Sequence, residues 1–90
     1  MLKSLEDLIN IIRDRKNSSS NKSYTKKLLE DKSLSTKKVK EEIAELIEAV
    51  ENNTNKIHEA ADVLYHLMVL LEANGIKIED VMEELKKRKK

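Results

Sequence analysis

The chain has 90 residues with 18 basic and 17 acidic side chains, so its formal net charge at pH 7 is +1. This balance, with two Tyr and no Phe or Trp, argues against a nucleic-acid binder, which needs a basic surface and aromatic rings for base stacking. The absence of Cys excludes disulfides, thiolate metal sites and cysteine nucleophiles. We expect one small domain over residues 1–90, with a core so limited that a homodimer would complete it.

Neither a membrane span nor a targeting segment is predicted. The longest uncharged apolar run covers nine residues, 63–71, whereas a spanning helix needs about 20. Glu6 and Asp7 place acidic groups too early for a signal peptide. We therefore expect a soluble protein of the cytoplasm.

Hydrophobic periodicity predicts an all-α bundle of four to five helices. With no Pro and one Gly, the chain has few helix breakers and cannot form a Gly-rich phosphate loop. The first helix is expected to span 2–16, followed by a polar loop over 17–23. Ser23 is expected to cap a short helix that begins at Tyr24. The apolar stripe of the first helix consists of Leu2, Leu5, Leu8, Ile9 and Ile12.

A longer helix is expected to begin at Ser35 or Thr36 and to fade in the Asn-rich segment 52–55. The third of the long helices, 57–74, is apolar around most of its circumference and is therefore expected to be buried, with Gly75 as a left-handed C-cap. A last, amphipathic helix follows. The core-facing stripes are expected to be Val39, Ile43, Leu46, Ile47 and Val50 in the longer helix, and Ile78, Val81, Met82 and Leu85 in the last one.

Four acidic residues on the two central helices are the candidate metal ligands. Glu59 and Asp62 lie one turn apart on the apolar third helix, where an unpaired carboxylate has a high desolvation cost. Glu42 and Glu45 share one side of the preceding helix at i,i+3 spacing. Antiparallel packing can bring the four together, and their mutual repulsion then requires divalent cations. Oxygen ligands without Cys favour Mg²⁺ or Mn²⁺ over zinc.

Simpler interpretations of these residues stay open. Glu-rich helix faces are commonly just solvated. The segment 58–62 imitates a zincin helix, but Asp62 stands in place of the second His, which argues against a metalloprotease. His66 is either a hydrogen-bonded histidine near the core or a group that orients a carboxylate or contacts a substrate. His58 is expected at the surface.

The acidic pattern resembles the metal signature of a known family. Glu41-Glu42-x-x-Glu45 followed by Glu59-x-x-Asp62 is similar to that of the all-α nucleoside-triphosphate pyrophosphatases, the MazG-like superfamily. Within it the chain resembles the phosphoribosyl-ATP pyrophosphohydrolases. The block 59–66, which ends in Tyr65-His66, is the most specific part.

Shorter matches extend the resemblance over nearly the whole chain. They are Asp14-Arg15-Lys16, Ser23-Tyr24-Thr25, Lys38-Val39-Lys40-Glu41-Glu42 and Leu85-x-x-Arg88. The departures are modest: Lys32 and Lys40 stand where the family often has Gly, and Glu48 stands where an aliphatic residue is usual.

The resemblance implies hydrolysis of the bond between the α and β phosphates of phosphoribosyl-ATP, to phosphoribosyl-AMP and pyrophosphate, in the second step of L-histidine biosynthesis. It implies that Glu42, Glu45, Glu59 and Asp62 hold Mg²⁺, or Mn²⁺ in its place. Glu41 or Glu45 would take the proton of the attacking water. The candidate substrate contacts are Arg15, Lys16, Lys22, Lys37 and Lys38 for phosphate, with Arg15 and Lys38 best matched, and Tyr24, Tyr65 and His66 for ribose or base.

Two other functions remain open from the sequence. A MazG-like pyrophosphatase of non-standard nucleoside triphosphates would share the acidic motif but would not need Arg15-Lys16 or Tyr65-His66. A non-catalytic helical dimerisation module would need no metal and would leave Glu59 and Asp62 exposed.

Overall fold

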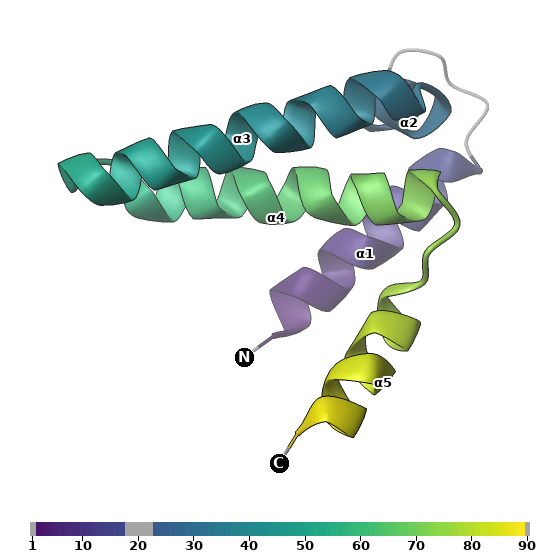
Figure 1. Cartoon of the computed structure of the whole chain (residues 1–90). Helices are drawn as coiled ribbons and strands as arrows, with labels where there is room; N and C mark the ends of the chain where they lie inside the picture. Colours follow the sequence, from purple (N-terminus) through teal and green to yellow (C-terminus); the bar gives the residue numbers. More distant parts are fainter. Residues whose placement is uncertain (1, 18–22, 90) are drawn as a thin grey trace.

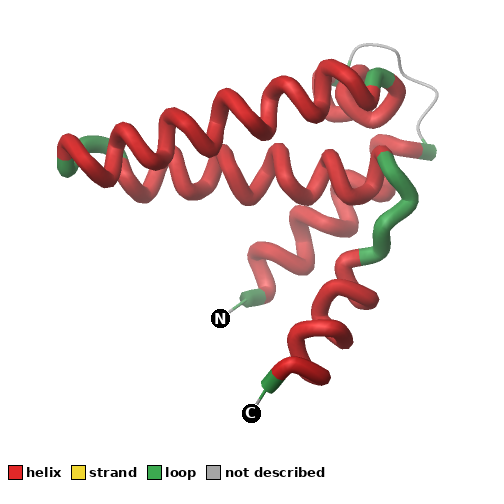
Figure 2. Tube along the Cα trace, viewed as in Figure 1, coloured by secondary structure: helices red, strands yellow, loops and turns green. Residues whose placement is uncertain are grey.

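The computed structural model describes residues 2–17 and 23–89, and within these ranges the chain forms α-helices and no strand (Figures 1 and 2). The all-α prediction is therefore confirmed. The centre of the expected polar loop, 18–22, lies outside the described residues, and Lys22 lies there too. The helices are α1 (Lys3–Lys16), α2 (Tyr24–Glu30), α3 (Lys32–Asn52), α4 (Lys56–Ala73) and α5 (Ile78–Arg88).

The two longest helices, α3 and α4, run antiparallel and form an arm that extends beyond the rest of the molecule (Figure 1). Their connection is short because Asn53 and Asn55 adopt left-handed backbone, with φ of 55° and 44°. Asn tolerates this conformation better than most residues with a Cβ. The tight turn fixes the register of the two helices and so decides which of their side chains meet.

The core lies where α1 and α2 pack against the C-terminal half of α4. Its buried members are Ile9, Ile12, Leu28, Leu29, Met68 and Val69. Burying an aliphatic side chain of this size contributes roughly 1.5–3 kcal/mol to stability. The far half of the arm has no such support, because α3 and α4 contact mainly each other there (Figure 1).

Two of the predicted helix ends are confirmed, and one predicted helix start is wrong. The Ser23 hydroxyl accepts from the Lys26 amide at 3.3 Å, as predicted for the start of α2, and Gly75 has φ of 69° just after α4. The prediction that α3 begins at Ser35 or Thr36 is wrong. The Asp31 carboxylate accepts from the Leu34 amide at 3.0 Å, so a good N-cap residue starts the helix at Lys32 instead.

The predicted core stripe of α3 is wrong in part. Val39 is buried and Leu46 is half-buried, but the other three members are exposed. The less exposed residues of α3 instead repeat at alternating spacings of four and three, a seam suited to one helical neighbour. That seam consists of Ser35, Val39, Glu42, Leu46 and Ala49. The exposed residues of the predicted stripe are Ile43, Ile47 and Val50.

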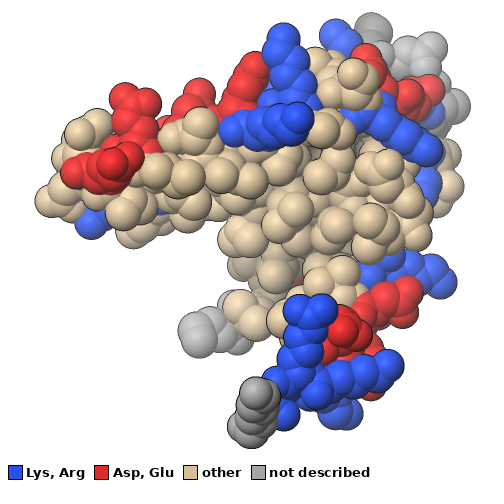
Figure 3. Space-filling model, viewed as in Figure 1, with Lys and Arg blue, Asp and Glu red and all other residues tan. Residues whose placement is uncertain are grey.

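The expectation that α4 is buried all round is also wrong for a single chain. Ile57 is 88% exposed and Leu64 is 46% exposed, because one neighbouring helix covers only one side of the arm. Figure 3 shows a largely uncharged surface along this part of the molecule. No helix in the described ranges has the length and apolarity needed to cross a membrane.

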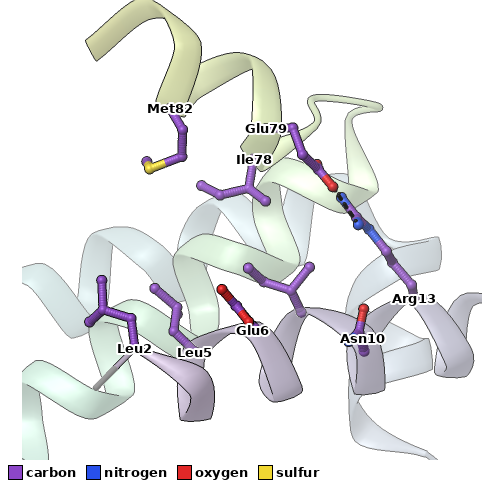
Figure 4. A pocket seen from close by; sticks show the side chains of 9 residues that line it. Leu2, Leu5, Glu6, Asn10, Arg13, Ile78, Glu79 and Met82 are labelled. Atoms are coloured by element: carbon purple, nitrogen blue, oxygen red, sulfur yellow. Dashed lines mark hydrogen bonds and ion pairs between the residues drawn. The ribbon is translucent and has the colours of Figure 1, made fainter. Parts of the chain in front are cut away.

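The last helix, α5, diverges from the body (Figure 1). Between α5 and α1 lies a cleft of about 560 Å³ (Figure 4). Leu2, Leu5 and Met82 line its apolar walls, and Arg13 and Glu79 close one end. None of the residues of α5 is buried. Of its predicted stripe, Ile78 and Val81 are half-buried, whereas Met82 and Leu85 are exposed.

Candidate functional site

Carboxylates from α3 and α4 meet in the middle of the arm. One oxygen each from Glu42, Glu45 and Glu59 lies within 4.8 Å of the others. Glu59 also belongs to a second group, in which ligand atoms of His58, Glu59 and Asp62 lie within 4.8 Å of one another. The structure thus brings together the four acidic side chains that the sequence singled out, with Glu59 common to both groups.

Two of these carboxylates, Glu42 and Glu59, are costly to ionise where they lie. Burial, followed by the neighbouring charge of Glu45, raises the pKa of Glu42 above its usual value. Burial and then Glu45 likewise raise the pKa of Glu59. The Oε2 atoms of Glu42 and Glu59 are buried and have no hydrogen-bond partner among the described residues. Buried oxygens of this kind are normally satisfied, so the cluster suits a cation that would coordinate them.

The two candidates for a general base differ in their surroundings. Glu41 pairs with Lys38, whose Nζ lies 3.3 Å from the Glu41 Oε2 atom, and this bond raises the pKa of Lys38. Glu45 is exposed and belongs to the carboxylate cluster itself. Of the two, Glu45 is therefore the one positioned beside a cation held by the cluster.

Tyr24 and His66 join α2 to α4 beside the carboxylates. The His66 Nδ1 atom lies 2.9 Å from the Asp62 carbonyl oxygen. A carbonyl only accepts, so Nδ1 carries the proton and Nε2 of the neutral ring is an acceptor. The Tyr24 hydroxyl lies 3.3 Å from Nε2 and donates to it. His66 is 8% exposed, which agrees with the simpler interpretation of it as a hydrogen-bonded histidine near the core.

A second bond between the same helices joins Thr25 and Tyr65 through their hydroxyl groups. Sequence reasoning assigned Tyr65 to a substrate and gave Thr25 no role at the site. The signal that could have found this pair is the adjacent Tyr24-Thr25 and Tyr65-His66, since each dipeptide offers two polar groups to a facing helix.

Arg15, Lys16 and Lys37 do not join the carboxylate cluster. Lys16 Nζ binds the Glu72 carbonyl oxygen at 3.2 Å, near the C-terminal end of α4. Thirteen residues of helix separate Glu59 from Glu72, about 20 Å at 1.5 Å per residue. Arg15 and Lys37 are exposed. Within one chain, Lys16 therefore lies at the opposite end of α4 from the acidic cluster.

Sequence reasoning missed Arg13, which binds two carboxylates at that far end. Its Nε donates to Glu72 at 2.6 Å, and its terminal nitrogens donate to Glu79 at 2.9 and 2.7 Å. Figure 4 shows the Arg13–Glu79 pair bridging α1 and α5. The bonds to Arg13 lower the pKa of Glu79 to about 2. No local pattern could have predicted partners 59 and 66 residues away.

Known proteins resemble this chain over almost its full length. A phosphoribosyl-ATP pyrophosphatase of Clostridium novyi is 47% identical, with the alignment covering 96% of this chain and 81% of the relative. One from Sulfurisphaera tokodaii is also 47% identical, covering 96% and 95%. A chloroplastic bifunctional protein of histidine biosynthesis from Arabidopsis thaliana is 43% identical over 97% of this chain, which spans 34% of that longer protein. The family model for phosphoribosyl-ATP pyrophosphohydrolase matches residues 5–89. The chain therefore belongs to the phosphoribosyl-ATP pyrophosphohydrolase family.

Proposed function

We propose that residues 1–90 act as one phosphoribosyl-ATP pyrophosphohydrolase domain that converts phosphoribosyl-ATP to phosphoribosyl-AMP and pyrophosphate, in the second step of histidine biosynthesis. Family membership supports the substrate. The observation that supports the chemistry is the carboxylate cluster. In it the Oε2 atoms of Glu42 and Glu59 are buried and have no hydrogen-bond partner among the described residues. A helical module that only dimerises has no use for such a costly arrangement.

The residues present fit a hard divalent cation. Glu42, Glu45, Glu59 and Asp62 would hold Mg²⁺, or Mn²⁺ in its place, because both prefer oxygen ligands. When bound, the ion would neutralise phosphate oxygens and lower the pKa of a water molecule. Glu45, which is exposed within the cluster, would accept the proton of the attacking water. Glu41 is the alternative base, but Lys38 already occupies its carboxylate.

The polar residues around the seam suggest how the substrate would lie. Lys38 pairs with Glu41 at 3.3 Å, and Glu41 directly precedes Glu42, so a phosphate bound by Lys38 would lie next to the carboxylates. Tyr65 and His66 would act mainly through their bonds to α2. Arg15 and Lys16, at the other end of α4, would meet the second phosphate of the substrate, on its phosphoribosyl group.

We propose a homodimer as the working form. Five large apolar side chains on the arm are exposed in the single chain, and they are more than a small soluble helix pair normally leaves uncovered. A symmetric interface between two arms would bury them together. The residues concerned are Ile43, Ile47, Val50, Ile57 and Leu64.

The function is tested by measuring pyrophosphate release from phosphoribosyl-ATP, dCTP and dUTP, each with Mg²⁺ and with excess chelator. We expect release from phosphoribosyl-ATP only, and only with the cation. Equal or better turnover of dCTP or dUTP would move the assignment to the MazG-like pyrophosphatases of non-standard nucleotides. Full activity in chelator would remove the metal from the mechanism, and no turnover of any substrate would favour the dimerisation module.

A matched pair of variants tests the cluster. Glu45 and Glu48 are both exposed glutamates of α3, but only Glu45 belongs to the cluster. Glu45→Gln should therefore lose most of the activity, whereas Glu48→Gln should retain it. Equal activities of the two variants would contradict the proposed role of Glu45.

A further inference from the structure

His58 offers an imidazole nitrogen at the exposed edge of the carboxylate cluster, and the proposed chemistry does not use it. The His58 Nε2 atom is 3.4 Å from the Asp62 Oδ2 atom. Together with a carboxylate oxygen of Glu59, these atoms lie within 4.8 Å of one another. All three residues belong to the first two turns of α4, so the backbone of one helix sets their relative positions.

The spacing of these residues suits a metal ion. Residues four apart on a helix share one face, and His-x-x-x-His at this spacing binds zinc in the zincin helix. Here Asp62 replaces the second His, which gives one imidazole nitrogen and carboxylate oxygens. His66, the other histidine of the chain, has both ring nitrogens engaged by Tyr24 and by the Asp62 carbonyl. His58 therefore supplies the one imidazole open to a new ligand.

The two groups that share Glu59 differ in the atoms that they offer to a metal ion. Glu42, Glu45 and Glu59 offer oxygen alone, which suits Mg²⁺. The group with His58 offers nitrogen as well, and imidazole suits Co²⁺, Ni²⁺ and Zn²⁺, which bind nitrogen and oxygen sites more tightly than Mn²⁺ does. The Glu59 Oε2 atom, buried and without a hydrogen-bond partner in the described chain, belongs to the residue that both groups share.

We propose that His58, Glu59 and Asp62 form a transition-metal position beside the all-carboxylate position and share Glu59 with it. The inference rests on the proposed function only in taking Glu59 and Asp62 as metal ligands. The His58 side chain is 72% exposed and that of Asp62 is 38% exposed. Ions at this position would therefore exchange readily with solvent, and water would complete their coordination.

The test is a Co²⁺ titration of the full-length, metal-free protein, followed by visible absorption and by melting temperature. Wild type should develop the absorption bands of nitrogen-bound Co²⁺ and melt at a higher temperature. His58→Asn should weaken Co²⁺ binding by about tenfold or more, a loss comparable to removing a supporting residue from a metal site. Its stabilisation by Mg²⁺ should stay unchanged. Lys56→Gln, on the same helical turn, is the matched control and should behave as wild type.

A second variant separates the two positions. Glu45→Gln should reduce the melting-temperature shift caused by Mg²⁺ but keep the Co²⁺ absorption bands. Identical Co²⁺ affinity and spectra in wild type and His58→Asn would overturn the proposal. Failure of the phosphoribosyl-ATP assay alongside an intact, His58-dependent Co²⁺ signal would refute the proposed function and leave this position standing. An active phosphoribosyl-ATP assay alongside a Co²⁺ signal that does not depend on His58 would support the proposed function and refute this metal position.

Discussion

Asp62 supports the fold through its backbone and would serve the proposed site through its side chain. Its carbonyl oxygen accepts from His66, whereas its carboxylate adds to the effects of burial and of Glu45 in raising the pKa of Glu42 and Glu59. Replacing the side chain therefore leaves the hydrogen bond to His66 in place. Its exposed pair with His58 contributes little to stability.

We accordingly predict that Asp62→Ala abolishes activity but does not destabilise the metal-free protein. Relief of carboxylate repulsion should leave the stability unchanged or raise it by about 0.5–2 kcal/mol, the usual gain from relaxing a functional site. With Mg²⁺ the order should reverse, since wild type gains binding free energy that the variant lacks. Melting curves in chelator and in Mg²⁺ measure both effects. A variant that melts well below wild type in chelator would show that this carboxylate supports the fold.

Glu42 gives the metal-free protein an unusual dependence on pH. Its folded pKa is raised above 4.5 by burial and by Glu45, so the folded state binds this proton more tightly than the unfolded state does. Stability from this residue is therefore present below pH 4.5 and is lost as the pH rises through the raised pKa.

We predict that Glu42→Gln in chelator is more stable than wild type at pH 8, and that the difference shrinks as the pH falls toward 4.5. Urea unfolding at several pH values measures this difference in the free energy of unfolding, with Glu48→Gln as the control outside the cluster. A difference that stays constant from pH 8 to 5 would mean that ionisation of Glu42 costs the fold nothing.

At the scale of elements, α5 is held by charge more than by burial. None of its residues is buried, and Arg13 links it to the body through Glu79 and Glu72. Glu72 is the less exposed partner, with 13% of its side chain accessible, so losing Arg13 leaves a carboxylate with only the longer contact to Lys16 at 3.8 Å.

We predict that Arg13→Gln loosens α5 and leaves the arm intact. Amide hydrogen exchange should quicken over 78–88 and stay unchanged in the central turns of α3 and α4. Stability should fall by about 1 kcal/mol, after allowance for solvent around the Glu79 pair. Glu84→Gln, which removes only an exposed pair with Arg88 within α5, is the control. Unchanged exchange in Arg13→Gln would mean that Ile78 and its neighbours hold α5 without help.

The elements themselves were largely predictable because the helices carry periodic apolar patterns and some of their ends carry local capping residues. Ser23 and Gly75 end helices through local chemistry, so the sequence identifies them. The rotation of α3 about its axis was not predictable in the same way. Ile43 and Ile47 are the most apolar choice for a core, but packing against α4 places Glu42 in the seam instead.

The grouping of side chains in the candidate site was predictable where carboxylates recur at helical spacing and not where distant segments meet. Glu42 with Glu45, and Glu59 with Asp62, lie one turn apart and so mark their faces. The bonds of Tyr24 and Thr25 depend on how α2 crosses α4, which no spacing encodes. The same limit hid Arg13, whose partners are on two other helices.

For the whole molecule, the distribution of apolar surface decides the oligomeric state. Leu67 and Leu71, two of the apolar residues of α4, pack against the core. Apolar side chains of the arm stay exposed in the single chain, where Ile47 is 55% exposed and Val50 is 58% exposed. Since the core supports only the other half of the hairpin, a second copy packed along the arm would stabilise the half that carries the carboxylates.

We predict that wild type sediments at twice its chain mass of 10.4 kDa at micromolar concentration, and that Ile47→Glu shifts it to the monomer. A glutamate buried in a symmetric interface would be present twice, once from each copy, and each carboxylate would carry a desolvation cost. Ile11→Glu is the matched control, because Ile11 is similarly exposed on α1 but lies outside the arm. Dissociation by Ile11→Glu with an intact Ile47→Glu dimer would move the interface to α1, and a wild type that sediments as a single chain would exclude the dimer.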